Sequence, residues 1–175
     1  MTSNFYNDLV NFIKLKEGGL TNNPQDTTAA KFPSPTPEKY HTNKGITYKT
    51  FLDSAASLKY IPSVQNFLNM PNEIWGSIFL NKYYNKTKNL TDNQILNGFI
   101  AYWAWQGWNN KITSVKDVTQ ILQNKLSNKE KLNALVNLRL NYYRTLSQNN
   151  PKYMPFLKGW NNTAKDYQTT FSPYL

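Results

Sequence analysis

One carboxylate stands out among the side chains that could do chemistry. Glu17 lies where a predicted amphipathic helix ends, and Gly18-Gly19 follows it. A carboxyl at such a junction can be partly desolvated, and desolvation favours the protonated form that a general acid must have. Glu17 is therefore the candidate general acid, and the plainer alternative is an ordinary solvated residue at a helix end.

Two further side chains could complete a hydrolytic site. Asp26 follows Pro24 and could reach the same cleft, while Thr42 could hold a water or a substrate hydroxyl. Glycoside hydrolysis uses such a carboxyl pair, one member to protonate the leaving oxygen and the other to serve the opposite face. Asp26 could also be a plain turn residue.

Aromatic residues offer a second kind of contact. Among the rings between Tyr102 and Trp108, we expect Trp103 in a packed core and Trp105 or Trp108 in contact with sugars. His41 is the one histidine. A metal site built on it would need carboxylate partners, and none can be located in the sequence, so His41 is expected to be an ordinary loop residue. No metal site, phosphate-binding loop, dinucleotide fingerprint or nucleophile elbow is predicted.

Helical periodicity positions these residues. A first helix is predicted from about Ser3 to Lys16, with Gly18-Gly19 as a left-handed stop. A long irregular stretch from about Leu20 to Thr47 follows, and it includes Phe32–Pro37, which cannot be regular helix. No convincing set of strands is found. The pattern therefore favours an all-α fold.

The second half of the sequence is also helical. Thr91-Asp92-Asn93-Gln94 has the form of a capping box and opens a helix that is apolar almost all round, which predicts the central buried helix. A further helix is expected from Ser114, and a long one ends at Asn149-Asn150-Pro151. Arg139 and Arg144 are most simply a solvated face.

Composition narrows the class of protein. A chain of 175 residues with 39% hydrophobic residues fits one compact domain, or two small halves that share a core. The net charge of +10 favours a polyanionic partner, which could be nucleic acid, an anionic membrane face or a cell wall. Only two cations are arginines, which weakens the nucleic-acid interpretation. The absence of cysteine excludes disulfides and thiolate metal sites.

The segment from Glu17 to Thr47 resembles glycoside hydrolase family 108, the bacterial and phage N-acetylmuramidases. That family has a helix ending in Glu-Gly-Gly, then Asp-Pro-x-Asp-Pro-Gly-Gly, then Thr-x-x-Gly-Ile-Thr. This chain keeps Glu17-Gly18-Gly19, Pro24, Asp26, Thr42 and Gly45-Ile46-Thr47. It departs by having Asn23 for the first Asp and an insertion, roughly Thr27 to His41, in place of Pro-Gly-Gly. The gap between Glu17 and Asp26 is also similar to that of phage-type lysozymes, whose third residue is a Thr. This selects Thr42, with Thr47 as the reserve and a candidate substrate contact.

The likeness continues thinly through the aromatic pair Tyr83-Tyr84, through Trp103–Gly107 and to the closing Gly159-Trp160. It implies an all-α, lysozyme-like single globular helical domain. Residues 1–88 would form the muramidase half, and residues 89–175 a helical, peptidoglycan-binding-like half packed on it.

The resemblance implies a peptidoglycan hydrolase that cleaves the β-1,4 bond between N-acetylmuramic acid and N-acetylglucosamine. Bacterial peptidoglycan is the expected partner, and the protein is expected to be a monomer. No nucleic-acid partner, membrane span or cofactor is expected. The N-terminus lacks the features of a signal peptide. Synthesis in the host cytoplasm is therefore expected, with holin-type release or carriage in a phage particle. The alternatives are an inactive wall-binding or phage-tail module and a basic nucleic-acid binder, the latter with strongly salt-dependent DNA affinity.

Overall fold

The computed structural model describes residues 2–23, 39–107 and 116–175. These residues are mostly helical, which confirms the all-α class. The chain divides into two compact units, Met1–Lys82 (unit 1) and Tyr83–Leu175 (unit 2). The sequence prediction had placed a division between residues 88 and 89. Asp26, Trp108 and the expected helix start at Ser114 lie outside the described residues.

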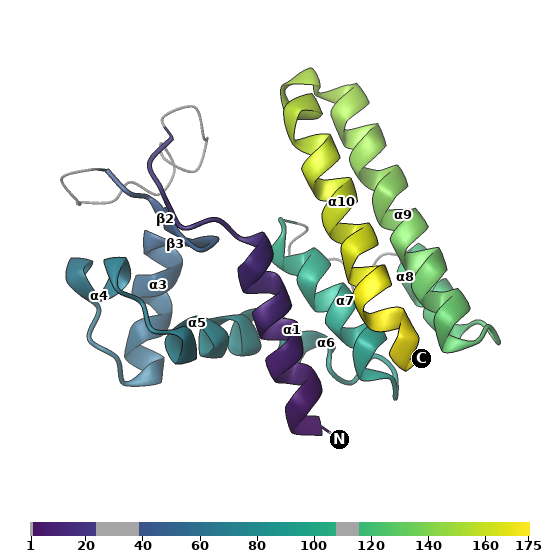
Figure 1. Cartoon of the computed structure of the whole chain (residues 1–175), viewed down its shortest axis with the longest axis horizontal. Helices are drawn as coiled ribbons and strands as arrows, with labels where there is room; N and C mark the ends of the chain where they lie inside the picture. The colour runs from purple at the N-terminus through teal and green to yellow at the C-terminus, as the bar shows by residue number, and fades with distance from the viewer. Residues whose placement is uncertain (1, 24–38, 108–115) are drawn as a thin grey trace. The chain divides into compact units, whose positions relative to one another are not determined.

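Unit 1 is built from helices, most of them short (Figure 1). Several aromatic side chains are buried in its core. Its helices are α1 (Thr2–Lys16), α3 (Tyr48–Ala55), the 3-10 turn η1 (Ala56–Leu58), α4 (Val64–Leu68) and α5 (Asn72–Phe79). Leu9 and Ile13 of α1 are fully buried, as the periodicity predicted. Phe51 of α3 meets Phe67 of α4 at 5.7 Å between ring centroids, so rings join the helices of this core.

A small antiparallel sheet in unit 1 corrects the expectation of no strands. The strands are β1 (Leu20–Thr21), β2 (Thr42–Asn43) and β3 (Ile46–Thr47), in the order β1-β2-β3. Thr21 pairs with Thr42, and Thr42 pairs with Thr47. Two-residue strands cannot display the alternation of apolar and polar residues by which strands are recognised in a sequence.

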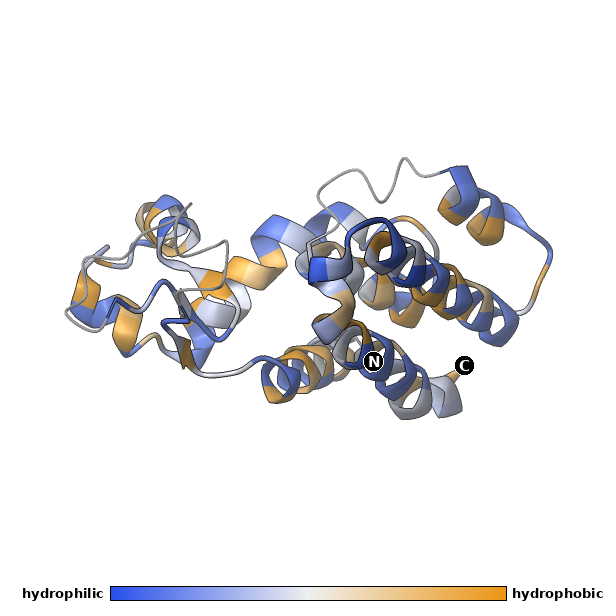
Figure 2. Ribbon diagram, turned by 90° about the horizontal axis from the view of Figure 1, so that it is seen from above, coloured by the Kyte–Doolittle hydropathy of each residue, from blue (hydrophilic) through white to orange (hydrophobic). Residues whose placement is uncertain are grey.

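Unit 2 is dominated by a long helical hairpin. It contains α6 (Asn85–Thr87), α7 (Gln94–Trp105), α8 (Lys116–Gln123), α9 (Asn128–Asn149), η4 (Pro151–Tyr153), α10 (Met154–Phe171) and η5 (Ser172–Tyr174); the π-helix η2 (Leu80–Tyr84) spans the division between the units. Helices α9 and α10 run side by side in opposite directions (Figure 1). Most helices are apolar on one side and polar on the other (Figure 2).

Helix α7 is the central buried helix that the sequence predicted. All of its residues from Ile95 to Ala104 are buried. The Tyr167 hydroxyl of α10 donates a 2.8 Å hydrogen bond to the Ile95 carbonyl, and its ring lies 5.2 Å from that of Phe99. Trp103 is fully buried, so its predicted place in the core is confirmed.

The predicted cap of α7 was wrong by two residues. Asn93, not Thr91, caps the helix, because its side-chain oxygen accepts hydrogen bonds from the Ile95 and Leu96 amides. The Thr91 amide instead donates to the side chain of Asn97, which is itself buried. The buried amide of Asn97 therefore organises the loop that enters α7, and this contact is not visible in the local sequence.

The prediction that Arg139 belongs to a solvated face was wrong. Its side chain is fully buried in unit 2. Its guanidinium carbon lies 5.5, 5.0 and 5.6 Å from the ring centroids of Phe99, Tyr102 and Tyr143. One guanidinium nitrogen donates to the Gln106 side-chain oxygen and to the Thr163 hydroxyl. No carboxylate of the described residues pairs with it, and burial lowers the pKa of Arg139.

Candidate functional site

Glu17 is the first residue beyond α1. The helix ends at Lys16, and the Glu17 amide still donates a 3.0 Å hydrogen bond to the Ile13 carbonyl. The expected left-handed stop is absent, because neither Gly18 nor Gly19 has a positive φ. The chain instead runs on directly into β1, where pairing with β2 fixes its direction.

A tight hairpin between β2 and β3 places Lys44 beside the glycine pair that follows Glu17. Lys44 and Gly45 form the two-residue connection between β2 and β3, with φ angles of 46° and 77°. Two positive φ angles in succession are typical of the turn that matches the twist of a hairpin, and Gly45 adopts its angle without a steric penalty. The Lys44 amide donates a 3.0 Å hydrogen bond to the Gly19 carbonyl, which joins the hairpin to the glycine pair after Glu17.

Two buried side chains fasten this hairpin to the helices of unit 1. Asn43 donates from its amide to the Phe67 carbonyl at 2.6 Å, near the end of α4. The indole nitrogen of Trp75 in α5 donates to the Lys44 carbonyl at 2.8 Å. The position of Lys44 beside Gly19 is therefore set by contacts on both sides of the hairpin.

A hollow of about 610 Å³ surrounds the end of α1. Its walls are formed by Asn11, Lys14, Leu15, Glu17, Gly18, Gly19 and Lys44. Glu17 is half-buried there, whereas Leu15 is 85% exposed. No atom would lie within 4 Å of a Cβ at either glycine, so the glycine pair leaves this wall open. The hollow thus combines one carboxylate, two ammonium groups and an accessible apolar side chain.

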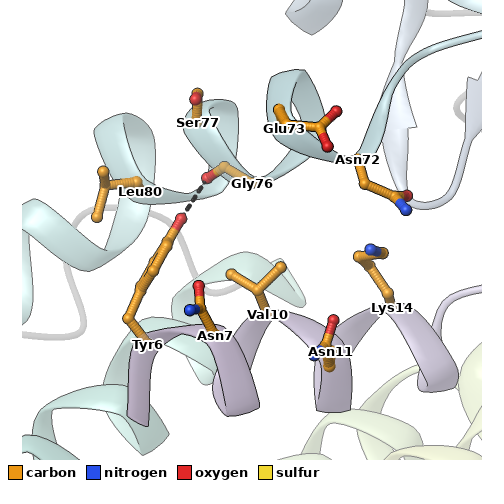
Figure 3. Close-up of a pocket in the computed structure, with 10 residues that line it drawn as sticks. All are labelled: Tyr6, Asn7, Val10, Asn11, Lys14, Asn72, Glu73, Gly76, Ser77 and Leu80. Carbon is orange, nitrogen blue, oxygen red and sulfur yellow. Dashed lines mark hydrogen bonds between the residues drawn. The ribbon is translucent and has the colours of Figure 1, made fainter. Parts of the chain in front are cut away.

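A groove of about 520 Å³ runs between α1 and α5 (Figure 3). Val10 and Lys14 point from α1 toward α5, and the Tyr6 hydroxyl donates a 2.7 Å hydrogen bond to the Gly76 carbonyl across the groove. A Cβ added at Gly76 would lie 3.5 Å from that hydroxyl, which is an ordinary van der Waals contact, so this approach does not itself require glycine.

The groove carries several polar side chains and adjoins the hollow. The side chains of Asn7, Asn11, Asn72 and Ser77 line it, and none of them has a hydrogen-bond partner among the residues that the structure describes. Asn11 and Lys14 line both the groove and the hollow. A ligand lying along α1 could therefore contact these amides and the Glu17 carboxylate together.

The other predicted site residues of unit 1 have structural contacts. Thr42 does not line the hollow; its hydroxyl lies 2.8 Å from Nδ1 of His41. The Thr47 hydroxyl caps α3 by accepting a hydrogen bond from the Thr50 amide at 3.0 Å. His41 lies outside any helix or strand, directly before β2, as predicted, but it is only 1% exposed. Its backbone hydrogen-bonds to Thr21 and Tyr48.

Trp105, the predicted sugar contact in unit 2, is half-buried at the end of α7. Its ring meets that of Tyr83 edge to face at 5.2 Å. Burial raises the pKa of the Tyr83 hydroxyl. The structure therefore gives Trp105 a packing contact within unit 2 and leaves the residue partly exposed.

Several residues of the hollow and groove were not predicted as site residues. Asn7, Asn11 and Lys14 follow one another at helical spacing on α1, so a polar stripe on the first helix was the available signal. Lys44 could not be recognised in this way, because only strand pairing brings it to Gly19.

The chain was compared with known protein families, with curated proteins and with solved structures. None of the three comparisons finds a match to this chain. In the described ranges no helix is long and apolar enough to cross a membrane. Within those same residues, no three His, Asp or Glu side chains are grouped so that they could hold a metal ion.

Proposed function

We propose that the chain hydrolyses peptidoglycan as an N-acetylmuramidase, with Glu17 as its general acid. The observation that carries the proposal is the half-buried Glu17 carboxyl in an open hollow that adjoins a polar groove. A glycosidase needs this arrangement: one acid at a cleft that can receive a chain of sugars. A lysis enzyme or a virion-borne lysin of a phage is the setting that this activity fits.

The groove has the chemistry that an amino-sugar polymer requires. Hydroxyl and acetamido groups of the glycan can exchange hydrogen bonds with the side-chain amides of Asn7, Asn11 and Asn72. Carboxylates on the muramyl lactyl groups or peptide stems can pair with Lys14 and Lys44 at the hollow. Exposed Leu15 adds an apolar contact for a sugar ring face.

In this proposal Glu17 protonates the glycosidic oxygen as the bond to the leaving sugar breaks. Asp26 is the second carboxylate, and it either attacks the anomeric carbon or activates water on the opposite face. The Thr42 hydroxyl lies against Nδ1 of His41 and outside the hollow, so we assign it no step in this proposal. General acid–base assistance of this kind contributes about 10²–10⁴-fold to the rate.

Replacing Glu17 by Gln is the sharpest test. Glu17→Gln keeps the shape of the side chain but removes the transferable proton, so we expect lysis of purified sacculi to fall by about 10²–10⁴-fold. Mass spectrometry of the wild-type products should find muramic acid at the new reducing ends. Asp8→Asn is the matched control, because Asp8 is an exposed carboxylate of α1, the helix that Glu17 follows, and it lines neither the hollow nor the groove.

Wild-type clearance by Glu17→Gln would contradict the assignment of the acid. A wild-type protein that binds sacculi without releasing reducing ends would favour the inactive wall-binding module instead. DNA binding without any effect on sacculi would favour the nucleic-acid binder.

A further inference from the structure

The tip of the α9–α10 hairpin exposes a run of apolar residues. Tyr153, Met154, Pro155, Phe156 and Leu157 follow one another where η4 passes into α10. Met154 is 53% exposed and Phe156 is 55% exposed. Large apolar side chains that are exposed singly are common on proteins, whereas adjacent ones mark an interaction surface.

Ring stacking holds this tip in place. The ring of Phe156 stacks on that of Trp160 at 5.8 Å, and Trp160 stacks in turn on the buried ring of Tyr143 at 4.6 Å. Tyr153 contacts the same indole at 6.0 Å. Phe156 therefore packs on a stack of rings that begins at buried Tyr143, and it remains exposed to solvent.

The same hairpin is free of acidic residues over a long range. From Lys131 to Lys165 the sequence contains six Lys and Arg residues and no Asp or Glu. Arg139 is buried, but Arg144, Lys152 and Lys158 are exposed around the tip. The Lys152 ammonium lies 4.9 Å from the centre of the Tyr153 ring, so cation and aromatic surface are in direct contact.

We propose that this tip binds the surface of an anionic lipid bilayer, with Met154 and Phe156 inserted among the headgroups. Apolar side chains buried at the headgroup level and lysines that contact lipid phosphates are the two components of peripheral membrane binding. Lysine stems can lie along the apolar layer while their ammonium groups stay at the phosphates. Tyrosine and tryptophan beside the tip suit the bilayer interface.

A sugar polymer fits this surface less well. A site for glycans pairs ring faces with polar side chains that hydrogen-bond hydroxyl groups. The sequence neighbours of Phe156 are the apolar residues Met154, Pro155 and Leu157. The charged residues that flank this run, Lys152 and Lys158, are cations, and the nearest side-chain amides in the sequence are Asn150 and Asn161. The proposal does not depend on the muramidase activity, because it concerns only residues of unit 2.

The test uses the full-length protein and sedimentation with vesicles. We expect binding to vesicles that contain phosphatidylglycerol and little binding to vesicles of phosphatidylcholine alone, with a blue shift of tryptophan fluorescence on binding. Replacing Met154 and Phe156 together by Ser should weaken binding at least about tenfold, because it removes the two large apolar side chains that the bilayer interface would bury. The control is Tyr174→Ser, an aromatic residue of unit 2 that is 77% exposed.

A second pair of variants tests the charge. Lys152→Gln with Lys158→Gln should weaken binding to the anionic vesicles, while Lys125→Gln with Lys129→Gln should not. The second pair lies at the other end of α9, about 33 Å away for a helix of 22 residues. Circular dichroism checks that each variant keeps its helices.

Several results would overturn the proposal. They are absence of vesicle binding, equal binding to both lipid mixtures, and wild-type binding by the Met154 and Phe156 variant. A loss of sacculus or DNA binding in that variant, with vesicle binding unchanged, would assign the tip to a polymer. A dimer that this variant disrupts would assign the tip to a second copy of the chain.

Discussion

At the scale of single residues, a substitution in the glycine pair after Glu17 should change the activity of the protein without changing its stability. Neither glycine has a positive φ, and a Cβ at Gly19 would meet no atom within 4 Å. Gly19→Leu should therefore leave the free energy of unfolding within about 0.5 kcal/mol of wild type. Its side chain would enter the hollow, so we expect sacculus lysis to fall several-fold.

The control for this change is Gly159→Leu in α10 of unit 2, where an added Cβ also meets nothing within 4 Å. Urea denaturation and turbidity measurements on both variants provide the comparison. Unchanged lysis by a folded Gly19→Leu protein would mean that substrate does not occupy the hollow.

Arg139 presents the second question at this scale, namely whether its charge or its packing stabilises unit 2. Arg139→Ala leaves a cavity between the rings of Tyr102 and Tyr143, and it should lower the free energy of unfolding by about 3–5 kcal/mol. Arg139→Met fills most of the space and removes the cost of burying a charge without a carboxylate partner. We expect the Met variant to be clearly more stable than the Ala variant in urea denaturation. Equal losses would show that the guanidinium hydrogen bonds outweigh its packing.

At the scale of elements, we expect the stability of the start of α9 to depend on pH through its capping box. The Ser127 hydroxyl and the Glu130 carboxylate satisfy each other's backbone amides. The hydrogen bond from the Ser127 side chain lowers the pKa of Glu130 below its ordinary value of 4.5. A depressed pKa in the folded state means that the contribution is complete above pH 4.5 and is lost as the pH falls through the folded-state pKa.

We therefore expect the stability difference between wild type and Glu130→Gln to shrink as the pH is lowered from neutral to below 4.5. Ser127→Ala should weaken the same pH dependence, because it removes the donor that lowers the pKa of Glu130. Thermal unfolding followed across this pH range measures both effects. A difference that stays constant with pH would contradict a contribution from the ionised carboxylate.

At the scale of the whole molecule, positive charge is concentrated in one unit. Unit 2 contains 12 Lys and Arg residues against 4 Asp and Glu, whereas unit 1 contains 8 against 6. The long-range attraction to an anionic wall polymer should therefore come mainly from unit 2. Attachment to sacculi should drop steeply as salt shortens the screening length to roughly 3 Å at 1 M.

The matched comparison is Lys116→Gln with Lys165→Gln in unit 2 against Lys16→Gln with Lys49→Gln in unit 1. We expect the unit 2 pair to weaken sacculus binding more at low salt, and both pairs to behave alike at high salt. Binding that is independent of salt would point to sugar stacking as the main attachment.

Patterns that repeat within one helix were sufficient to predict much of this molecule. Apolar spacing predicted α1 with buried Leu9 and Ile13, and an almost wholly apolar segment predicted the buried helix α7. The position of Glu17 at a helix end also followed from the sequence, since α1 ends at Lys16. These features depend on neighbours within a few residues along the chain, and the sequence displays such neighbours directly.

The tertiary structure decided the features that join distant residues. Strand pairing links Thr21 to Thr42, and so it brings Lys44 to the glycines after Glu17. The burial of Arg139 depends on rings from α7 and on Thr163 of α10, none of which is near it in the sequence. A strand of two residues or a lone arginine has no local pattern that specifies its partner. Only the packing of the complete chain selects that partner, because the energy of a strand pair or a buried cation comes from groups far along the sequence.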